Sequence, residues 1–219
     1  MAVIEPEHLK LVVELFAKEM KHDGFLGSRF KNEDIVNCVI GHSAATAVAA
    51  MAAGLLPGAA SVVATGIAVA SIWTMYWRIC KIAGIKLKKN VIKALASAVL
   101  ANIVTQFAGL ILAEVVLSFV PGLAIVICGM VNFAVVYFAG LVFIKALTDI
   151  FKAKRDVNLN GVDIEAAVKK ATASTNKDAV FKESKSVFNA MHKDGSLKKE
   201  GRKAQMEIDK EAKNANDNE

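Results

Sequence analysis

The sequence predicts an all-α integral membrane protein with two tandem helical hairpins in the membrane. Both ends of the chain are predicted to form soluble cytoplasmic helices. Residues 35–148 contain one acid, Glu114, and seven bases, six of them within residues 78–93. Pro57-Gly58 and Pro121-Gly122 each interrupt a long apolar run, and another apolar run follows each pair. A water-exposed surface needs more charge than this segment has. We therefore expect lipid around it and one helical hairpin at each Pro-Gly pair.

Composition divides the chain into four segments. Residues 1–34 and 152–195 have mixed charge and are expected to form soluble helices, whereas residues 35–151 form the membrane domain. Residues 196–219 are expected to be disordered or a frayed helix, because they offer few apolar side chains to bury. The formal net charge of +6 does not indicate nucleic-acid binding, since most of it flanks apolar runs, as charges that orient membrane helices do.

Residues 7–22 are predicted to form an amphipathic helix that ends near Gly24. Its apolar residues recur at helical spacing: Leu9, Val12, Val13, Phe16 and Met20. Such a helix could lie on a membrane surface or pack on the protein's own soluble part. Its mixed charge favours packing.

Four apolar runs are candidate membrane spans: residues 35–56, 59–77, 94–117 and 123–147. About 20 apolar residues cross a hydrocarbon core of roughly 30 Å. Asn32, with the two acids that follow it, is a typical helix start. The first run is the weakest candidate, because it is rich in alanine and holds several polar residues. The structural turns of the two hairpins are Pro57, Gly58, Pro121 and Gly122.

Basic residues precede the first run, fill the link between the hairpins and follow the last run, whereas the two Pro-Gly turns have none. The positive-inside rule therefore places both termini and the link in the cytoplasm. The bases of the link are Arg78, Lys81, Lys86, Lys88 and Lys89, with Lys93 at its end. An alternative is that the hairpins dip into one leaflet, or stay sheltered in a compact helical core until triggered.

Two helices are predicted after the membrane domain. Asp163 caps a short one, and a second covers residues near 178–192 and stops at Gly195. One face of the second helix carries an apolar stripe that includes Phe181, Val187, Phe188 and Met191. We expect this stripe to bind a soluble partner or to pack on helix 7–22.

Four polar residues within the apolar runs are candidates for function: His42, Asn102, Glu114 and Asn132. A neutral His42 bonded to a neighbouring helix suits a packing role, and a proton or ligand role is the alternative. Glu114 is interpreted as an interfacial or protonated carboxyl, with a functional role as the alternative. Asn102 and Asn132 are interpreted as hydrogen-bonding partners between helices.

The sequence predicts no catalytic or metal site. Cys38, Cys80 and Cys128 lie in or beside apolar runs and have no C-x-x-C spacing, so buried packing is expected. The sequence has no phosphate-binding loop, no dinucleotide glycine fingerprint and no H-E-x-x-H motif. We therefore expect no enzymatic activity and no cofactor.

The stretch WRICKIAGIKL (77–87), preceded by LLPGAASVVATG and followed by FVPGLAIVICG, resembles a bacterial membrane-domain family of unknown function. Members of that family are often fused to small GTPases or encoded near them. The resemblance covers residues 36–150 and rests on architectural positions: Pro57, Gly58, Arg78, Lys81, Gly84, Pro121 and Gly122. It implies a multi-pass protein of the bacterial cytoplasmic membrane. Because this chain lacks a nucleotide-binding domain, a GTPase partner would act in trans.

We expect a non-enzymatic membrane interaction or scaffold module that works with soluble cytoplasmic partners or with copies of itself. The small residues within 44–54 favour close helix packing or self-association. One alternative is a pore-forming or membrane-permeabilising effector resembling bacteriocin-type toxins, which shelter an apolar hairpin inside a soluble helical bundle. Another is a small channel or transporter that uses His42, Glu114 and Asn132.

Overall fold

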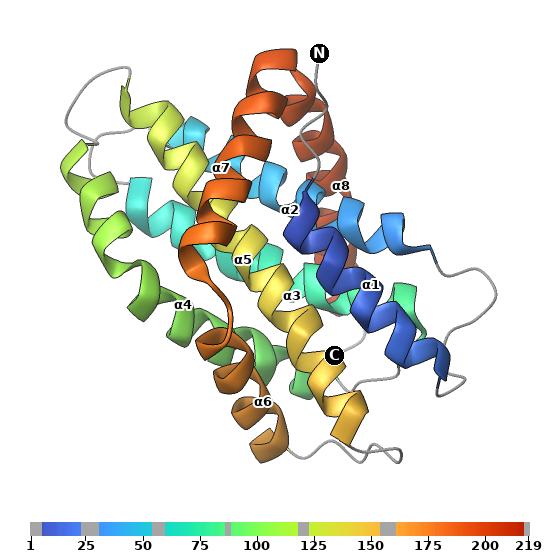
Figure 1. Cartoon of the computed structure of the whole chain (residues 1–219). Coiled ribbons are helices and arrows are strands. Elements are labelled where there is room, and N and C mark those ends of the chain that lie inside the picture. The colour runs from blue at the N-terminus through green and yellow to red at the C-terminus, as the bar shows by residue number, and fades with distance from the viewer. Residues whose placement is uncertain are drawn as a thin grey trace.

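The described residues of the chain form eight α-helices and contain no strand, so the all-α prediction is confirmed (Figure 1). The helices are α1 (Glu7–His22), α2 (Asn32–Ala53), α3 (Ala60–Ala83), α4 (Lys89–Leu117), α5 (Leu123–Ala153), α6 (Gly161–Ala173), α7 (Lys177–Asp194) and α8 (Ser196–Asn216). The computed structural model describes residues 6–22, 31–53, 60–85, 89–117, 123–153 and 161–216. It describes the backbone alone for residues 22, 60–67, 89, 104–108, 110–117, 123–124, 153, 161–164 and 212–216.

Helix α5 runs through the centre of the molecule (Figure 1). It packs against α1, α2, α3, α4, α6 and α7. Its side chains are buried without interruption from residue 136 to residue 144, which means that they are buried on every face of the helix. A helix that is apolar all round must be enclosed by protein or by lipid, and here protein encloses this stretch of it.

Two helical stretches among the described residues are long and apolar enough to cross a membrane, Asn32–Ala53 and Ile125–Lys152. Helix α4 contributes only a shorter apolar stretch, Asn90–Ile103, and the described part of α3 does not pass the same test. The prediction of four spans is therefore not confirmed. Both long stretches are mostly buried within the bundle, as the core helices of soluble proteins also are.

Helices α2 and α5 lie antiparallel, and two glycines of α5 set how closely they approach. A Cβ atom added at Gly129 would lie 2.5 Å from Cγ of Met51, and one added at Gly140 would lie 2.8 Å from Cγ1 of Val39. Both separations are shorter than any ordinary van der Waals contact between carbon atoms. The absence of a side chain at these two positions is therefore what lets the most apolar helix pack against α2.

Replacing Gly140 with alanine is expected to lower the free energy of unfolding by about 1–2 kcal/mol. The added methyl group meets both methyl groups of Val39, whose branched side chain has little rotamer freedom. The matched control is Gly109→Ala in α4, because a Cβ added there has no heavy atom within 4 Å. Alanine favours a helix over glycine, so this variant should raise the free energy of unfolding by up to ~1 kcal/mol. Chemical denaturation followed by circular dichroism measures both variants. Shifts of the same sign would contradict the close approach of α2 and α5.

The buried side chain of Tyr76 holds α3 against α5. The ring of Tyr76 stacks on that of Phe143 with centroids 3.8 Å apart, and its hydroxyl donates to the carbonyl oxygen of Ala139 at 2.9 Å. A buried tyrosine hydroxyl needs such a partner, because leaving it unpaired costs roughly 1–3 kcal/mol. On the other side, Lys93 of α4 lies 5.7 Å from the ring centroid of Trp73 and links α3 to α4.

Helices α3 and α4 extend into the predicted basic link. Arg78 and Lys81 lie in the last turns of α3, and Lys89 is the first residue of α4. Gly84 ends α3 with a positive φ of 72°, and the N–H of Ile85 donates to the carbonyl oxygen of Cys80 at 2.8 Å. This is a common helix ending, and bases in the last turns are favoured by the helix dipole.

Helix α1 forms as predicted and packs on the protein rather than standing apart from it. Leu9, Val13, Phe16 and Met20 are fully buried, and α5 is the main helix that they cover. Glu183 of α7 accepts hydrogen bonds from the backbone N–H groups of the first turn of α1, at His8 (2.8 Å) and Leu9 (3.3 Å). The same carboxylate accepts from the hydroxyl of Tyr137 in α5 at 2.6 Å. One acid therefore joins three helices.

Helix α6 closes the bundle beside the C-terminal part of α5, where it also packs on α4. Among its described side chains, Val168, Ala171 and Thr172 are buried. The ammonium group of Lys145 donates to the carbonyl oxygen of Ser174 at 3.0 Å, just beyond the end of α6. Lys145 thus satisfies a carbonyl group that no helical N–H can reach.

The apolar stripe of α7 faces α5. Val187 and Phe188 are buried, and the ring of Phe188 meets Phe133 of α5 edge to face with centroids 5.8 Å apart. Phe181 and Met191 are half-buried and pack against the same core. The residues predicted as a contact surface for a partner are therefore used inside the molecule, and α7 packs on α5 more than on α1. Asn176 caps the helix by accepting from the N–H of Ala179 at 3.1 Å.

The expectation of a disordered or frayed tail does not hold for Ser196–Asn216, which form α8. Apolar side chains are as few as the sequence indicates, but Gly201 and Ala204 continue the buried face between Leu197 and Ile208. Small residues need little apolar area, because they let the two helix axes come close enough for contact. Helix α8 packs mainly on α2, with lesser contact to α7 and α3.

Candidate functional site

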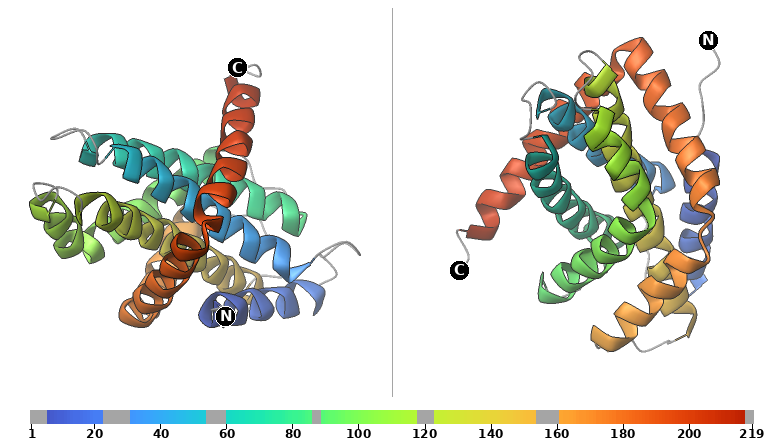
Figure 2. Two further views of the ribbon diagram at one scale, coloured as in Figure 1. Left: turned by 90° about the horizontal axis from the view of Figure 1, so that it is seen from above. Right: turned by 90° about the vertical axis from the view of Figure 1, so that its left-hand side faces the viewer.

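The helix ends on either side of the two Pro-Gly pairs lie together at one end of the bundle, away from α1 and α6 (Figures 1 and 2). The helix ends that meet there are the last residues of α2 and α4 and the first residues of α3 and α5. No charged residue occurs in 43–77 or 115–144, the sequences on either side of these ends. In the described parts of α3 and α5 nearest this end, Val69 is 43% and Val126 38% exposed.

Helix α8 lies across the middle of α2 instead of alongside it (Figure 2). Ala45 of α2 forms a small apolar cluster with Ala204 and Ile208 of α8, separate from the main core. At Gly201 the backbones nearly touch, because an added Cβ would lie 2.9 Å from the carbonyl oxygen of Ala44. A polar helix with ten charged side chains therefore rests on the helix that the sequence predicts as the first span.

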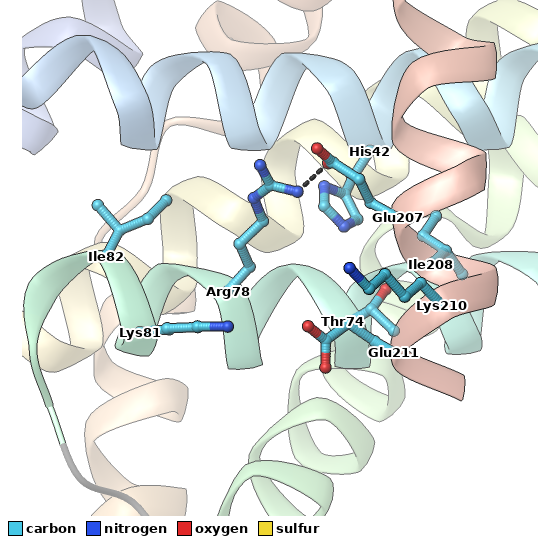
Figure 3. Close-up of a pocket in the computed structure, with 9 residues that line it drawn as sticks. All are labelled: His42, Thr74, Arg78, Lys81, Ile82, Glu207, Ile208, Lys210 and Glu211. Carbon is cyan, nitrogen blue, oxygen red and sulfur yellow. Dashed lines mark hydrogen bonds and ion pairs between the residues drawn. The ribbon is translucent and has the colours of Figure 1, made fainter. Parts of the chain in front are cut away.

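A charged groove lies between α2, α3 and α8 (Figure 3). It consists of two adjoining cavities of about 530 and 560 Å³, both of which His42, Arg78, Ile82 and Glu207 line. An ion pair between the guanidinium group of Arg78 and the carboxylate of Glu207 stands where the two cavities meet. The remaining charged residues of the first cavity are Lys81, Lys210 and Glu211.

His42 is held by its own helix. Its Nδ1 lies 2.8 Å from the carbonyl oxygen of Cys38, one turn earlier, and 2% of the residue is exposed. Its own carbonyl oxygen accepts from Thr46 at 2.9 Å and from Ser71 of α3 at 3.2 Å. In Figure 3 the imidazole lies beside the Arg78–Glu207 pair, on the wall of the groove. The ring's fixed position agrees with a packing role.

The groove offers ionic contacts, and its one described thiol–imidazole contact is buried: Sγ of Cys38 lies 3.7 Å from Nδ1 of His42, and the two residues are 6% and 2% exposed. The Arg78–Glu207 pair is half-exposed, with side chains 38% and 36% accessible, so its net stabilisation is about 0–1 kcal/mol. Among the described residues, no three His, Cys, Asp or Glu side chains come close enough together to hold a metal ion. The three cysteines are free and buried, which excludes a disulfide between them in this structure.

The structure brings together three of the sequence-predicted residues, His42, Arg78 and Lys81. Asn102 in α4 and Asn132 in α5 lie elsewhere, and each amide donates to a carbonyl oxygen one turn earlier in its own helix, at 2.8 and 2.9 Å. Other predicted residues fall outside the described part of the chain: Pro57, Gly58, Lys86, Lys88, Pro121 and Gly122. The side chains of Lys89 and Glu114 are not among those described.

Sequence reasoning missed Glu207 and Glu183, two acids that link helices to one another. Each sits in a charged helix where nothing in the local pattern separates it from its neighbours. The available signal for Glu207 is indirect: Leu197, Gly201, Ala204 and Ile208 recur at helical spacing, which places Glu207 at the edge of a small-residue face.

No protein-family model, curated protein or solved structure matches this chain. The resemblance to the GTPase-associated membrane-domain family therefore stays a prediction that rests on the quoted motifs.

Proposed function

We propose that this protein is a non-enzymatic, membrane-associated interaction module that enters lipid with the apolar ends of its two hairpins. The observation that carries this proposal is the gathering of both uncharged hairpin ends at one end of the bundle, while the charged helices cover the remainder. An apolar surface of this kind on an otherwise charged protein is typical of a membrane or protein contact site. The charged helices α1, α6, α7 and α8 then stay on the cytoplasmic side with the basic link.

The depth of insertion in this conformation is limited by α8. Val48 of α2 lies against α8, since a Cβ added at Gly201 would be 3.0 Å from its Cγ2. Helix α2 continues for five residues beyond Val48, to Ala53, which is about 8 Å of helix at 1.5 Å per residue. A hydrocarbon core is roughly 30 Å thick, so one leaflet measures roughly 15 Å. While α8 stays in place, the part of α2 beyond it is short enough to lie within one leaflet.

The position of α7 on α5 gives the same expected depth of insertion for the second hairpin. Polar helix α7 reaches α5 at Phe133, through the ring of Phe188. Ten residues separate Phe133 from the start of α5 at Leu123, about 15 Å of helix. We therefore favour hairpins that dip into the cytoplasmic leaflet over four complete spans, and α8 and α7 would have to move before either long apolar helix could cross the bilayer.

Cysteine labelling from both sides of the membrane tests the proposal. Single cysteines at Ser61, Ser118 and Lys88 are placed in a background without Cys38, Cys80 and Cys128, and a membrane-impermeant thiol reagent is added outside or inside. We expect Lys88→Cys to react from the cytoplasmic side. Ser61→Cys and Ser118→Cys are expected to react from neither side until detergent is added, because their thiols lie in hydrocarbon. Labelling of these two from outside would establish complete spans instead, and labelling from the cytoplasmic side would mean that they lie in water.

The soluble side would hold the partners, either a cytoplasmic protein such as a GTPase in trans or further copies of the chain. Chemical cross-linking in membranes, followed by mass measurement, distinguishes the two: a ladder at multiples of 23.4 kDa identifies self-association. A single cross-linked species of another mass identifies a different protein. Recovery of the monomer alone would contradict the scaffold role.

A pore-forming or membrane-permeabilising effector is the second candidate, and the burial of α5 among six other helices favours it. Such effectors must fold in water before they meet a membrane. Purification as a stable monomer without detergent, together with dye release from liposomes, would establish this function. Purification that requires detergent, with no dye release, would favour the resident module.

A further inference from the structure

Helix α8 approaches α2 closely, but their contact buries few apolar side chains. Among the side chains of α8 that the structure describes, residues 196–211, three are both apolar and buried, Leu197, Ala204 and Ile208. Ala204 and Ile208 belong to a small cluster that is separate from the main core. The groove described above leaves cavities on both sides of the Arg78–Glu207 ion pair, so this interface is poorly filled. A contact that buries few apolar side chains is of the kind that opens without unfolding the core.

One residue joins α8 to α7. Gly195 has a positive φ of 79°, and a Cβ there would meet nothing within 4 Å. The carboxylate of Asp194 accepts from the N–H of Ser196 at 2.9 Å, and hydrogen bonds from Ser196 hold the pKa of this carboxyl below its usual range. The first turn of α8 is therefore capped from its own sequence and does not depend on α2 for its helical start.

The exposed face of the first half of α8 is basic. Lys198, Lys199, Arg202 and Lys203 are all exposed. Glu200 is the one acid among residues 196–206. Clusters of exposed lysine and arginine next to a membrane-inserting segment are attracted to anionic lipid headgroups. A membrane entered by the hairpin ends would bring such headgroups to the same side of the molecule as α8.

We infer that α8 is a removable strap: it holds the first hairpin in one leaflet, and an anionic lipid surface draws α8 off α2 so that α2 and α3 sink deeper. The inference rests on the proposed membrane insertion and adds its regulation. Helix α2 has the length and composition to cross a bilayer once the charged side chains of α8 have left it. Its face beneath α8, which carries Gly41, Ala44 and Ala45, is a small-residue surface suited to packing against another helix.

A disulfide that fastens α8 to α2 tests the strap. A Cβ added at Gly41 would lie 3.5 Å from Cβ of Ala204, which is within the range for a disulfide. The variant Gly41→Cys/Ala204→Cys is made in the background without the three native cysteines and is compared oxidised and reduced. The two single-cysteine variants are the matched controls. Equal melting temperatures of the reduced double variant and its background show that the substitutions leave the fold intact.

Two measurements distinguish binding to vesicles from the depth to which the protein inserts. Flotation with vesicles reports binding, and quenching of Trp73 and Trp77 by lipids brominated deep in their acyl chains reports sinking of α3. On anionic vesicles we expect both forms to float and the reduced form to be quenched at least twofold more than the oxidised one. Equal quenching of two floating forms would overturn the strap while leaving the proposed insertion in place. Failure of both forms to float would overturn the insertion itself and the strap with it.

The nature of the trigger is tested with zwitterionic vesicles. There we expect the reduced and oxidised forms to float with the same low quenching, because nothing draws α8 away. Deep quenching of the reduced form on these vesicles would contradict the anionic trigger.

A second variant is designed to detach α8 from α2 on any membrane, without the use of a disulfide. Gly201→Ala places a methyl group 2.9 Å from the carbonyl oxygen of Ala44 and should force α8 off α2. We expect it to show at least twofold deeper quenching than the parent even on zwitterionic vesicles. The matched control is Gly109→Ala, where the added methyl group meets nothing within 4 Å. Equal quenching of Gly201→Ala and Gly109→Ala would contradict the strap.

Discussion

Replacing Phe188 with aspartate is expected to release α7 from the bundle while the protein still binds vesicles. Phe188 is fully buried, its ring meets Phe133 edge to face, and His192 stacks on it at 5.8 Å between centroids. Truncating a buried phenylalanine costs about 3–5 kcal/mol, and an aspartate adds the cost of a buried charge. Total stabilities of about 5–15 kcal/mol leave little margin for such a loss.

Limited proteolysis and chemical denaturation measure the effect of Phe188→Asp, and flotation measures membrane binding. We expect cleavage within residues 177–194 at protease concentrations that leave the parent intact. The control is Asn189→Asp, which adds the same charge at the next position, where the side chain is exposed. If Phe188→Asp also abolishes flotation, the hairpin ends and the polar helices are not separable regions. If its stability equals that of Asn189→Asp, α7 does not pack on α5 as described.

Replacing Val126 with arginine is expected to weaken vesicle binding about 100-fold. Val126 lies near the start of α5 and is 38% exposed, so a long side chain can be placed there without displacing the core. An arginine in hydrocarbon costs about 2.5–3.5 kcal/mol, and each 1.4 kcal/mol corresponds to a tenfold change in partition. The arginine side chain can extend toward the headgroups, so we expect a free-energy cost in the lower part of this range.

Leu11→Arg is the matched control, because Leu11 is also an exposed apolar residue, at 55%, but lies on α1 among the charged helices. We expect its partition into vesicles to equal that of the parent within a factor of two. Partition coefficients from flotation at several lipid concentrations measure both variants. A loss for Leu11→Arg and none for Val126→Arg would place the membrane contact on α1 and overturn the insertion through the hairpin ends.

Several elements could be predicted because their signal is local. The apolar stripe of residues 7–22 has the spacing of one helix face, and α1 buries those residues. The run 123–147 is apolar on every face, and α5 is the central helix that this composition requires. The stripe of α7 was predicted as an apolar face, but its partner was not, since several helices of similar apolar character compete for it.

Other features depend on contacts between residues distant in sequence. Glu183 caps α1 only because α1 begins beside α7, and Glu207 meets Arg78 only because α8 crosses α2 and α3. Residues 196–216 look too polar to fold by themselves, since Gly201 and Ala204 contribute almost no apolar area. These two residues contribute by letting α8 approach α2 closely. Amino-acid composition does not show which helices will approach each other in this way.

By itself, the sequence determined that this protein is helical, that its middle segment avoids water and that its charges gather at the two ends and around residue 80. Helical periodicity and the free energy of burying apolar side chains are properties of neighbouring residues, so they can be read locally. Tertiary structure alone decided that protein surrounds much of α5 and that a charged helix crosses α2 at its middle. An apolar helix is stable both in lipid and in a protein core, and only the packing of segments distant in sequence decides between the two environments.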